Sequence, residues 1–348
     1  MSAPSSSLSP SELKSQLIDQ ARELGFESVG VVAVPVELRQ DYFMRWLEKG
    51  MHAEMRWMAN NPERRAYPQQ LMPEARSIIV CGLNYYQPEL ERRGRIAKYA
   101  LGKDYHKIIY KKLKRLCAWL RDQGGQNRPY VDTGPLLEKP IAEQAGIGWQ
   151  GKNTVILNPT EGQWLFLGNI LTTLELPADQ PPANRCGSCT RCIDVCPTQA
   201  IVAPYELDAR KCISYLTIEH PGPIPMEFRE AIGDHLFGCD DCLDVCPWNR
   251  WAGESRETKL AARPYPDLRE MLDWEDEHFH TTFEGTPIRR LKLPRWLRNI
   301  CVVLGNTGTL EDLPALQKTA QHADPMVAEH AEWAITRIQQ RLSHENSP

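Results

Sequence analysis

Eight of the eleven cysteines in this chain fall into two sets whose spacing is typical of metal binding. One set reads Cys-x2-Cys-x2-Cys-x3-Cys-Pro, and the other ends in Cys-x2-Cys-x3-Cys-Pro with one cysteine far upstream. In ferredoxin-type domains such runs hold [4Fe–4S] clusters, and the cysteine before proline ligates the other cluster. The sequence therefore predicts a first cluster held by Cys186, Cys189, Cys192 and Cys246 and a second held by Cys196, Cys212, Cys239 and Cys242.

Zinc ribbons and disulfides also use paired cysteines. Zinc sites rarely have the x2-x2-x3 run closed by proline, which occurs here once whole and once split by a long insertion after Cys212. The chain opens Met-Ser-Ala-Pro-Ser-Ser-Ser, which is polar and lacks the apolar core of an export signal. We therefore expect reduced thiols, and clusters are favoured over zinc and over disulfides.

Asp132 is a candidate acid because it follows the apolar stretch Tyr130-Val131 and precedes Gly134-Pro135. A carboxyl group removed from water at this point would have a raised pKa and could donate a proton. The same pattern also fits a turn aspartate that caps the following segment.

Asp104 and His106 form an Asp-x-His pair at the start of an amphipathic segment. Some cobalamin proteins bind cobalt through the histidine of Asp-x-His-x-x-Gly, but Ile109 stands at the glycine position here. Cobalt ligation by His106 is therefore doubtful. Asp104 also suits a helix N-cap with His106 in the first turn, and in either case the stretch could line a pocket.

The composition is that of a globular protein of two or three domains, with 348 residues, 42% apolar and 25% charged. It contains no run of about 18 apolar residues, so we expect no membrane span. The net charge of −4 argues against a nucleic-acid partner, but basic residues are segregated. Residues 92–115 hold ten Lys or Arg and one acid, and residues 286–298 hold five and no acid. Such stretches favour a polyanionic partner, although charge runs are also common on solvated faces.

Hydrophobic periodicity predicts an α+β region over residues 1–175. We expect helices over 9–24, 38–60, 104–121 and 141–145. We expect strands over 29–32 and 77–83, one ending at 130–132, and a hairpin of 154–157 with 164–173. The glycines of 146–151 have the spacing of a dinucleotide-binding turn, but they follow a helix and lead into a strand, which is the wrong context.

A proline-rich linker over 177–182 leads into the cysteine region. Beyond it, helices are predicted over 297–304, 310–321 and 327–342, broken by Gly-Asn and Asp-Pro. Short paired helices of this kind resemble HEAT-type units. Two units cannot bury an apolar face alone, so we expect them to pack on the rest of the protein.

The chain resembles the epoxyqueuosine reductase family of tRNA queuosine synthesis over about residues 10 to 342. This family is related to corrinoid reductive dehalogenases. The stretches that carry the resemblance are the two cysteine sets, Lys98-Tyr99, Gly102–His106, Asp132–Pro135, Ala145–Thr154, Arg298-Asn299 and Leu304–Asn306.

The resemblance implies a cobalamin-binding α/β domain at residues 1–176, a ferredoxin-like two-[4Fe-4S] domain at 177–255 and a HEAT-like helical tRNA-binding region at 256–348. It implies that the epoxide of epoxyqueuosine, at the wobble position of tRNA, is reduced to the alkene. The clusters would pass the electrons to cobalamin. The helical region would help to grip the anticodon stem-loop. We also expect a cytoplasmic monomer supplied by a low-potential electron donor.

The resemblance also implies roles for individual residues. Asp132 would donate a proton to the departing oxygen, because an alkoxide is a poor leaving group at neutral pH. The corrinoid and substrate pocket would be lined by Arg56, Lys98, Tyr105, His106, Asp132 and Asn153. The phosphates of tRNA would be contacted by Arg289, Arg290, Lys292, Arg295 and Arg298.

Two other classes of protein fit parts of the pattern. A corrinoid iron–sulfur reductase of a small molecule, such as a dehalogenase, usually has a twin-Arg export signal and needs no basic helical tail. A non-enzymatic electron-transfer or RNA-binding iron–sulfur protein would bind no corrinoid. Binding of cobalamin and activity on tRNA that carries epoxyqueuosine would separate the three.

Overall fold

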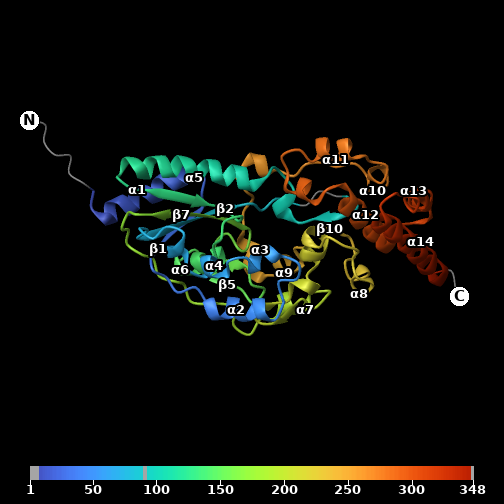
Figure 1. Ribbon diagram of the computed structural model, residues 1–348, viewed down its shortest axis with the longest axis horizontal. Helices are drawn as coiled ribbons and strands as arrows, with labels where there is room; N and C mark the ends of the chain where they lie inside the picture. The colour runs from blue at the N-terminus through green and yellow to red at the C-terminus, as the bar shows by residue number, and fades with distance from the viewer. Residues whose placement is uncertain (1–7, 89–91, 346–348) are drawn as a thin grey trace, which may run out of the picture.

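The computed structural model describes residues 8–88 and 92–345. The polar residues 1–7, on which the expectation of no export signal was based, lie outside the described residues. A layered sheet-and-helix part lies at one end of the molecule and a layer of long helices lies at the other, with the cysteine region between them (Figure 1).

The sheet has four strands in the order β1-β2-β7-β4, and all neighbours are antiparallel. These strands are β1 (Ser28–Ala33), β2 (Ser77–Asn84), β4 (Asn127–Tyr130) and β7 (Leu165–Thr172). The strands that we predicted at 29–32, 77–83 and 164–173 are confirmed. β2 is buried along its whole length, because helices cover both faces of the sheet.

Alternate residues of β2 enter two different cores, as the period of a strand requires. Ile79 and Cys81 pack with α1 (Pro10–Glu23) and α5 (Tyr105–Asp122) on one face. Ile78 and Val80 pack on the other face against residues of α6 (Glu138–Gln144). Figure 1 shows α1 and α5 above the sheet and α6 below it.

Two features of this region differ from the sequence prediction. The expected helix over 38–60 is divided into α2 (Gln40–Glu48) and α3 (Arg56–Ala59), because Gly50 adopts a left-handed conformation (φ 64°) that ends α2. The expected hairpin of 154–157 with 164–173 is wrong. Residues 156–157 (β6, Ile156–Leu157) pair back with β5 (Trp149–Gln150) across the turn at Gly151, and β7 pairs with β2 and β4.

The middle of the chain consists of short elements. They are α4 (Pro62–Ala66), β3 (Arg95–Ile96), α7 (Arg191–Asp194), β8 (Ile201–Ala203), β9 (Glu206–Leu207), a π-helix (Tyr215–Glu219), α8 (Met226–Arg229), β10 (His235–Phe237) and α9 (Asp241–Asp244). β3 pairs in parallel with β10, so the sheet part and the cysteine region are joined by main-chain hydrogen bonds.

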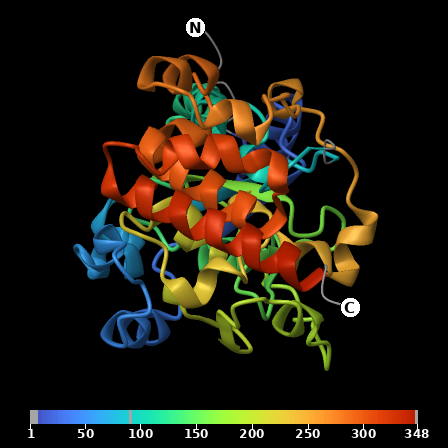
Figure 2. The ribbon, with the colours of Figure 1, turned by 90° about the vertical axis from the view of Figure 1, so that its right-hand side faces the viewer.

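The C-terminal layer is built on α12 (Leu293–Thr307) and α14 (Pro325–Glu345), which lie side by side (Figure 2). The shorter helices are α10 (Leu268–Met271), α11 (Asp276–Thr282) and α13 (Leu313–Thr319). Apolar residues of this layer share one core with Leu101 and Phe237, so the helices pack on the rest of the protein as expected.

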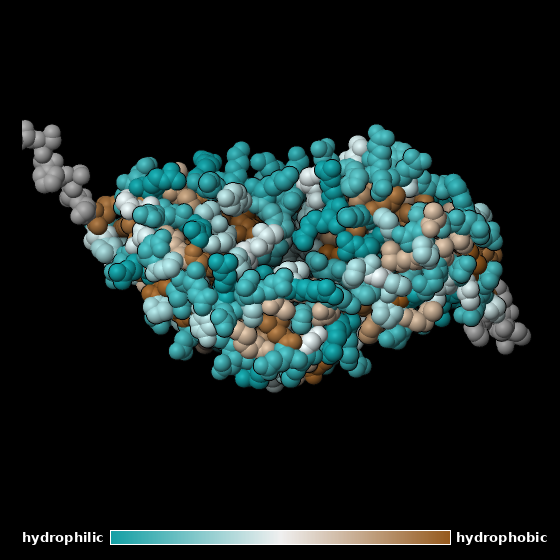
Figure 3. Space-filling model, viewed as in Figure 1, coloured by the Kyte–Doolittle hydropathy of each residue, from teal (hydrophilic) through white to brown (hydrophobic). Residues whose placement is uncertain are grey.

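Hydrophilic side chains cover most of the visible surface, and apolar side chains are scattered between them (Figure 3). Within the described ranges, no helix combines the length and the apolar character that a membrane crossing requires.

Candidate functional site

A cavity of about 510 Å³ opens where the sheet part, the cysteine region and the C-terminal layer meet. Its volume is in the range of small-molecule sites. It contains polar groups from the start of α5, the loop after β4 and the start of α6. We call it the Asp132 cavity. Its walls include Met55, Tyr99, Tyr105, His106, Asp132, Lys139, Leu207, Ala209, Cys212, Ile218, Phe237, Arg290 and Leu291.

Asp132 lies in the loop that follows β4 and has a left-handed backbone (φ 50°), which is uncommon for a residue other than glycine. Its Oδ2 accepts a hydrogen bond from the Tyr105 hydroxyl at 2.9 Å and lies 2.9 Å from His106 Nε2. Both contacts use Oδ2, and the side chain is 50% exposed within the cavity. The loop therefore presents a carboxylate to whatever enters the cavity.

His106 lies between two carboxylates. Its Nδ1 is 2.7 Å from Asp104 Oδ1, and its Nε2 faces Asp132. Burial lowers the pKa of His106, but the hydrogen bonds to Asp104 and Asp132 outweigh it and raise this pKa to about 9. His106 is therefore an imidazolium at neutral pH, with an N–H directed at each carboxylate. Asp104 is the N-cap of α5, as predicted, and it also holds this ring in place.

The pKa of Asp132 differs from our expectation. Burial raises it, but the hydrogen bond and the positive charge of His106 and the hydroxyl of Tyr105 lower it overall. The prediction of a raised pKa is therefore wrong for the free cavity, because the sequence did not show that a cation would pair with the carboxylate. In this pair the proton is on His106.

The half-buried Glu138 and the buried Arg65 hold the Asp132 loop, and no pattern in the sequence singled out either. Glu138 Oε1 accepts hydrogen bonds from the Asp132 backbone N–H at 3.0 Å and from Asn169 at 2.9 Å. Burial, and then the charge of Asp132, raise the pKa of Glu138 to about 7. On the other side, Arg65 donates to the Gly134 carbonyl. These contacts explain how the loop keeps its strained backbone.

Lys139 is a cavity residue that the sequence analysis missed. Burial lowers the pKa of its ammonium group, while Asp132, Cys242, Glu138 and Cys212 act in the opposite direction. The Lys139 ammonium is therefore an electrostatic neighbour both of the Asp132 carboxylate and of two thiols of the second set. In the sequence, Lys139 is marked only by its position before Pro140, and a lysine before a proline does not indicate a functional site.

The four cysteines predicted for the first cluster line one small cavity of about 80 Å³. Burial, and then the neighbouring thiols Cys186, Cys246 and Cys189, together raise the pKa of Cys192 to about 11. The same four thiols are thus electrostatic neighbours. A closed set of four thiols suits a [4Fe–4S] cluster, which takes thiolate ligands.

The four cysteines predicted for the second cluster are also neighbours. Burial raises the pKa of Cys212 to about 11, and Cys196 contributes to the shift. The pKa of Cys239 is raised by burial and then by neighbours that include Cys212 and Cys242. Cys212 also lines the Asp132 cavity. The second set therefore forms part of the cavity wall, and the first set lies behind it.

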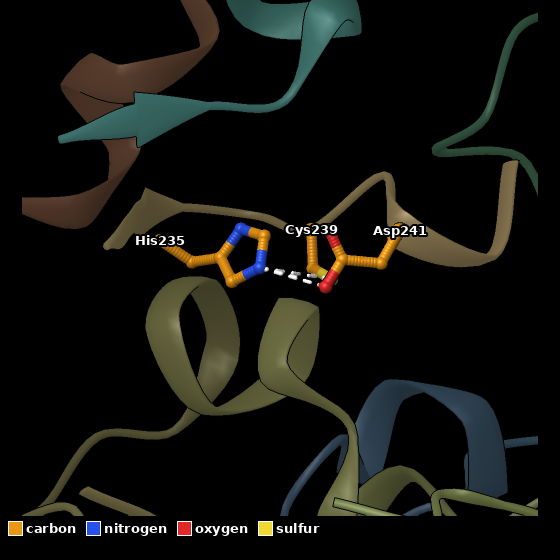
Figure 4. Close-up of side chains that lie close together, drawn as sticks. All are labelled: His235, Cys239 and Asp241. Carbon is orange, nitrogen blue, oxygen red and sulfur yellow. Dashed lines mark hydrogen bonds and ion pairs between the residues drawn. The ribbon is translucent and has the colours of Figure 1, made fainter. Parts of the chain in front are cut away.

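His235 connects one of these thiols to a carboxylate (Figure 4). Its Nε2 lies 2.9 Å from Asp241 Oδ2 and 3.7 Å from Cys239 Sγ. Such a trio could hold a metal ion by itself, but Cys239 also belongs to the second set of four thiols. His235 is therefore placed to form a hydrogen bond with a cluster ligand.

Two residues predicted for the pocket lie elsewhere. Lys98 is buried, with its ammonium 2.8 Å from Asp244 and 5.0 Å above the ring of Trp164. Asn153 is buried beside the first cluster and donates to the Cys242 carbonyl at 3.2 Å. The sequence placed them in the cavity because their motifs flank it, but both pack behind its wall.

The remaining pocket predictions fall nearer to the cavity. Tyr105, His106 and Asp132 line it together. Arg56 is exposed at the start of α3, next to the cavity residue Met55.

The predicted tRNA-binding set separates into exposed and internal members. Arg298 is fully buried and donates to the carbonyls of Leu216, His220 and Gly222, so its inclusion was wrong. Arg295 is partly buried and donates to the Leu291 and Ile218 carbonyls. The exposed members, which we call the rim cations, are Arg289, Arg290 and Lys292.

One of the rim cations belongs to the Asp132 cavity: Arg290 lines it and lies 3.8 Å from Glu219. Arg289 and Lys292 are exposed beside Arg290 in the chain. The basic stretch of residues 92–115 contacts the chain just before the stretch of residues 286–298, because the Asp104 backbone N–H donates to the Gly285 carbonyl at 2.7 Å. Lys107 is exposed on the first turn of α5, the helix that Asp104 caps.

Comparison with known proteins gives a consistent result over the whole chain. Residues 65–133 match the family described as "Epoxyqueuosine reductase QueG, DUF1730", and residues 185–249 match a "4Fe-4S double cluster binding domain". An epoxyqueuosine reductase of Pseudomonas aeruginosa is 42% identical over 343 residues, which cover 94% of this chain and 95% of that protein. The Escherichia coli K12 enzyme is 40% identical over 328 residues, with 90% and 86% covered.

Solved structures agree with these matches. An epoxyqueuosine reductase crystallised with an epoxyqueuosine-modified tRNA-Tyr stem loop is 30% identical, with a TM-score of 0.87 over 97% of this chain and 94% of that chain. The Bacillus subtilis enzyme, solved with its catalytic loop swung out of the active site, is 32% identical. Its TM-score is 0.84, over 94% of this chain and 90% of that chain.

Proposed function

This chain belongs to the epoxyqueuosine reductase family, and on that premise we propose that it reduces the epoxide of epoxyqueuosine at the wobble position of tRNA to the alkene, giving queuosine. One observation carries the proposal beyond family membership. The Asp132 cavity has a proton source, His106 with Asp132, on one wall and a cluster ligand, Cys212, on another. Protons and electrons can therefore reach one bound group.

The reaction needs both protons and electrons. Conversion of an epoxide to an alkene breaks two carbon–oxygen bonds and releases the oxygen as water. It consumes two electrons and two protons. The electrons would arrive singly through the clusters, and at least one proton must reach the oxygen as its bond to carbon breaks.

The pair of His106 and Asp132 can supply that proton. In the free cavity the proton is on His106 Nε2, 2.9 Å from Asp132 Oδ2. When substrate fills the cavity and displaces water, the charge-separated pair loses solvation. The proton then moves to Asp132, and the neutral carboxyl group donates it to the epoxide oxygen. Asp104 keeps the ring aligned for the next proton.

The residues of the cavity suit cobalamin as the second cofactor. Met55, Leu207 and Leu291 provide apolar surface, and the thiol of Cys212 places the second cluster at the wall. Both nitrogens of His106 face carboxylates, so this ring would serve proton transfer, and the apolar side chains would hold the corrinoid. When bound, cobalamin would supply the low-potential two-electron chemistry that the epoxide requires.

We extend the proposal to the two clusters. The anaerobically purified protein should contain about eight irons and equal sulfide, because two complete sets of four thiols are present. Cys186→Ala should remove the first cluster and leave the second, which uses none of its ligands. Iron and sulfide analysis, with electron paramagnetic resonance of the reduced protein, measures both. Stoichiometric zinc without sulfide would contradict this prediction.

We also propose that residues 1–176, 177–255 and 256–348 serve as the cobalamin-binding, cluster-binding and tRNA-gripping parts, with the rim cations contacting the phosphates of the anticodon stem-loop. The position of Arg290 in the cavity wall, with Arg289 and Lys292 exposed beside it in the chain, supports this, since the modified base must enter the cavity while its backbone stays outside. Recognition of the tRNA would then combine an everted base with contacts to phosphates that carry no sequence information.

Neutralising two rim cations should therefore weaken the dependence of tRNA binding on salt. For Arg289→Gln/Lys292→Gln we expect the slope of log affinity against log salt to fall by roughly two units, about one for each contact. Filter binding at several salt concentrations measures the slope. The matched control is Arg22→Gln/Arg121→Gln, which removes two exposed cations from the last turns of α1 and α5. If Arg289→Gln/Lys292→Gln keeps the wild-type slope, as the control should, the tRNA phosphates contact another surface. The α5 stretch that includes Lys107 is then the next one to test.

The function itself is tested with the protein reconstituted anaerobically with both clusters and cobalamin. It should convert epoxyqueuosine to queuosine in tRNA when a chemical reductant is supplied, as measured by mass spectrometry of the digested nucleosides. A protein that binds both cofactors and tRNA but leaves the epoxide intact would refute the proposal.

A further inference from the structure

The first cluster lies close to a charged surface that the reaction at Asp132 does not use. Cys189 is exposed, whereas Cys212 of the second set lines the Asp132 cavity. The loop that holds Cys186 and Cys189 is clamped by Lys152, whose ammonium donates to the carbonyls of Gly187 and Cys189 at 2.8 and 2.9 Å. The cysteine sets therefore form a path with one end at the surface and the other at the cavity.

A wide hollow of about 810 Å³ borders this loop. It shares Arg191, Cys246 and Pro247 with the first-cluster cavity, so the wall of that cavity is also the floor of the hollow. Apolar surface from Tyr86 and Trp164 lies in the hollow. The exposed ring of Trp251 lies beside it, 4.5 Å from the guanidinium of Arg250.

The charge of this surface is positive. Arg185, Arg191 and Arg250 are exposed, and within residues 8–88 and 92–345 none of them forms an ion pair with a carboxylate. Of the two acids of the hollow, Asp244 is paired with Lys98 at 2.8 Å. Asp194 accepts from the Thr190 hydroxyl at 2.8 Å and keeps its negative charge, so the three arginines still outnumber it. Residues 180–193 contain no acid at all.

We propose that this surface docks a small acidic low-potential electron-carrier protein. We call it the electron-uptake face and define it by Arg191 and Arg250, which line the hollow, and by Arg185, which lines the adjoining first-cluster cavity. The inference rests on the proposed function, because that function needs electrons. Each docking event transfers one electron from the reduced carrier to the first cluster, and two events supply one epoxide. Cations around an exposed apolar patch steer an acidic partner and allow it to leave, which suits a transient redox complex.

An RNA backbone is also anionic, but the structure favours the protein carrier. The modified base of tRNA must enter the Asp132 cavity, whose lining includes none of the residues of the hollow. Arg290, one of the rim cations, already lines that cavity. Positive charge at the surface end of the cluster path therefore suits a partner that delivers electrons.

The test uses the cluster-loaded full chain and reduced acidic ferredoxin as the probe. In Arg185→Glu/Arg191→Glu, the rate of cluster reduction, followed by loss of visible absorbance in stopped flow, should fall at least tenfold at low salt. The difference should shrink at high salt, where the charges are screened. Reduction by reduced methyl viologen should not be slowed. The control Arg22→Glu/Arg121→Glu, with the same change of charge, should behave like the wild type.

Three results would overturn the inference, and each is separable from failure of the proposed function. An unchanged ferredoxin rate in the double variant would remove the docking surface. A loss of tRNA affinity with an unchanged ferredoxin rate would assign the cations to RNA. Equal slowing in the control variant would show that the effect comes from the overall charge of the protein and not from this face. Conversion of epoxyqueuosine by chemically reduced wild-type protein tests the proposed function independently of all three.

Discussion

Asp132→Asn should lower turnover of epoxyqueuosine-containing tRNA by about 10²- to 10⁴-fold, the range expected when a general acid is lost. The amide keeps the size of the side chain and can still accept hydrogen bonds from Tyr105 and His106. It cannot carry a proton to the departing oxygen, which would then leave as an alkoxide. Single-turnover rates with prereduced enzyme and saturating tRNA isolate this step from electron delivery and from binding.

The matched control for this variant is Tyr105→Phe. It removes the other hydrogen bond to Asp132 Oδ2 but leaves the acid and the imidazolium in place. A neutral hydrogen bond of this kind contributes about 1 kcal/mol, so the rate should fall by no more than about tenfold. If Asp132→Asn turned over at the Tyr105→Phe rate, with cobalamin and tRNA binding intact, the proton would come from another group.

The same pair predicts how turnover depends on pH. The pKa of His106 is raised to about 9, so the proton is present below that pH and is lost as pH rises through it. Turnover should therefore decline above pH 9. In His106→Gln the decline of turnover above pH 9 should disappear, because glutamine does not titrate. If turnover of that variant still declined with the same midpoint pH, a different group would be responsible.

The cluster ligands could be predicted from sequence because their chemistry requires fixed local spacing. Three cysteines of the first set lie within seven residues, and Cys246 was assigned to them through the rule that the cysteine before proline crosses over. The structure brings these four thiols to one cavity. The same cross-over rule groups the distant Cys212 with Cys196, and these two thiols are electrostatic neighbours in the fold.

The proton source was only half predictable. The sequence singled out Asp132 and the Asp104–His106 pair separately, but it contained no information that the chain would bring His106 to 2.9 Å from Asp132, 26 positions further on. The sign of the pKa shift depends on that contact, and the prediction from burial alone was therefore wrong. Glu138 and Lys139 escaped notice for the same reason, since their importance arises only from where the loop after β4 lies.

Arg298 shows how a run of basic residues can mislead. Arg289, Arg290, Lys292, Arg295 and Arg298 look alike in sequence, yet burial divides them. Helix α12 turns Arg298 into the interior, where it donates five hydrogen bonds, three to main-chain carbonyls and two to Asn299 Oδ1. Its partners lie in and just after the π-helix (Tyr215–Glu219), which forms part of the cavity wall. A charge that appeared to face RNA instead fastens the site to the C-terminal layer.

Arg298→Met should therefore destabilise the protein by about 2 kcal/mol, since one buried and two partly buried carbonyls lose their donor and an unsatisfied buried group costs about 1 kcal/mol or more. Methionine keeps the length of the side chain, so little cavity is created. The midpoint of urea unfolding, measured anaerobically on cluster-loaded protein, reports the change. Arg289→Met is the matched control, because Arg289 is exposed, and it should stay within about 0.5 kcal/mol of wild type. If both variants unfolded at the wild-type midpoint of urea, Arg298 would not fasten the π-helix.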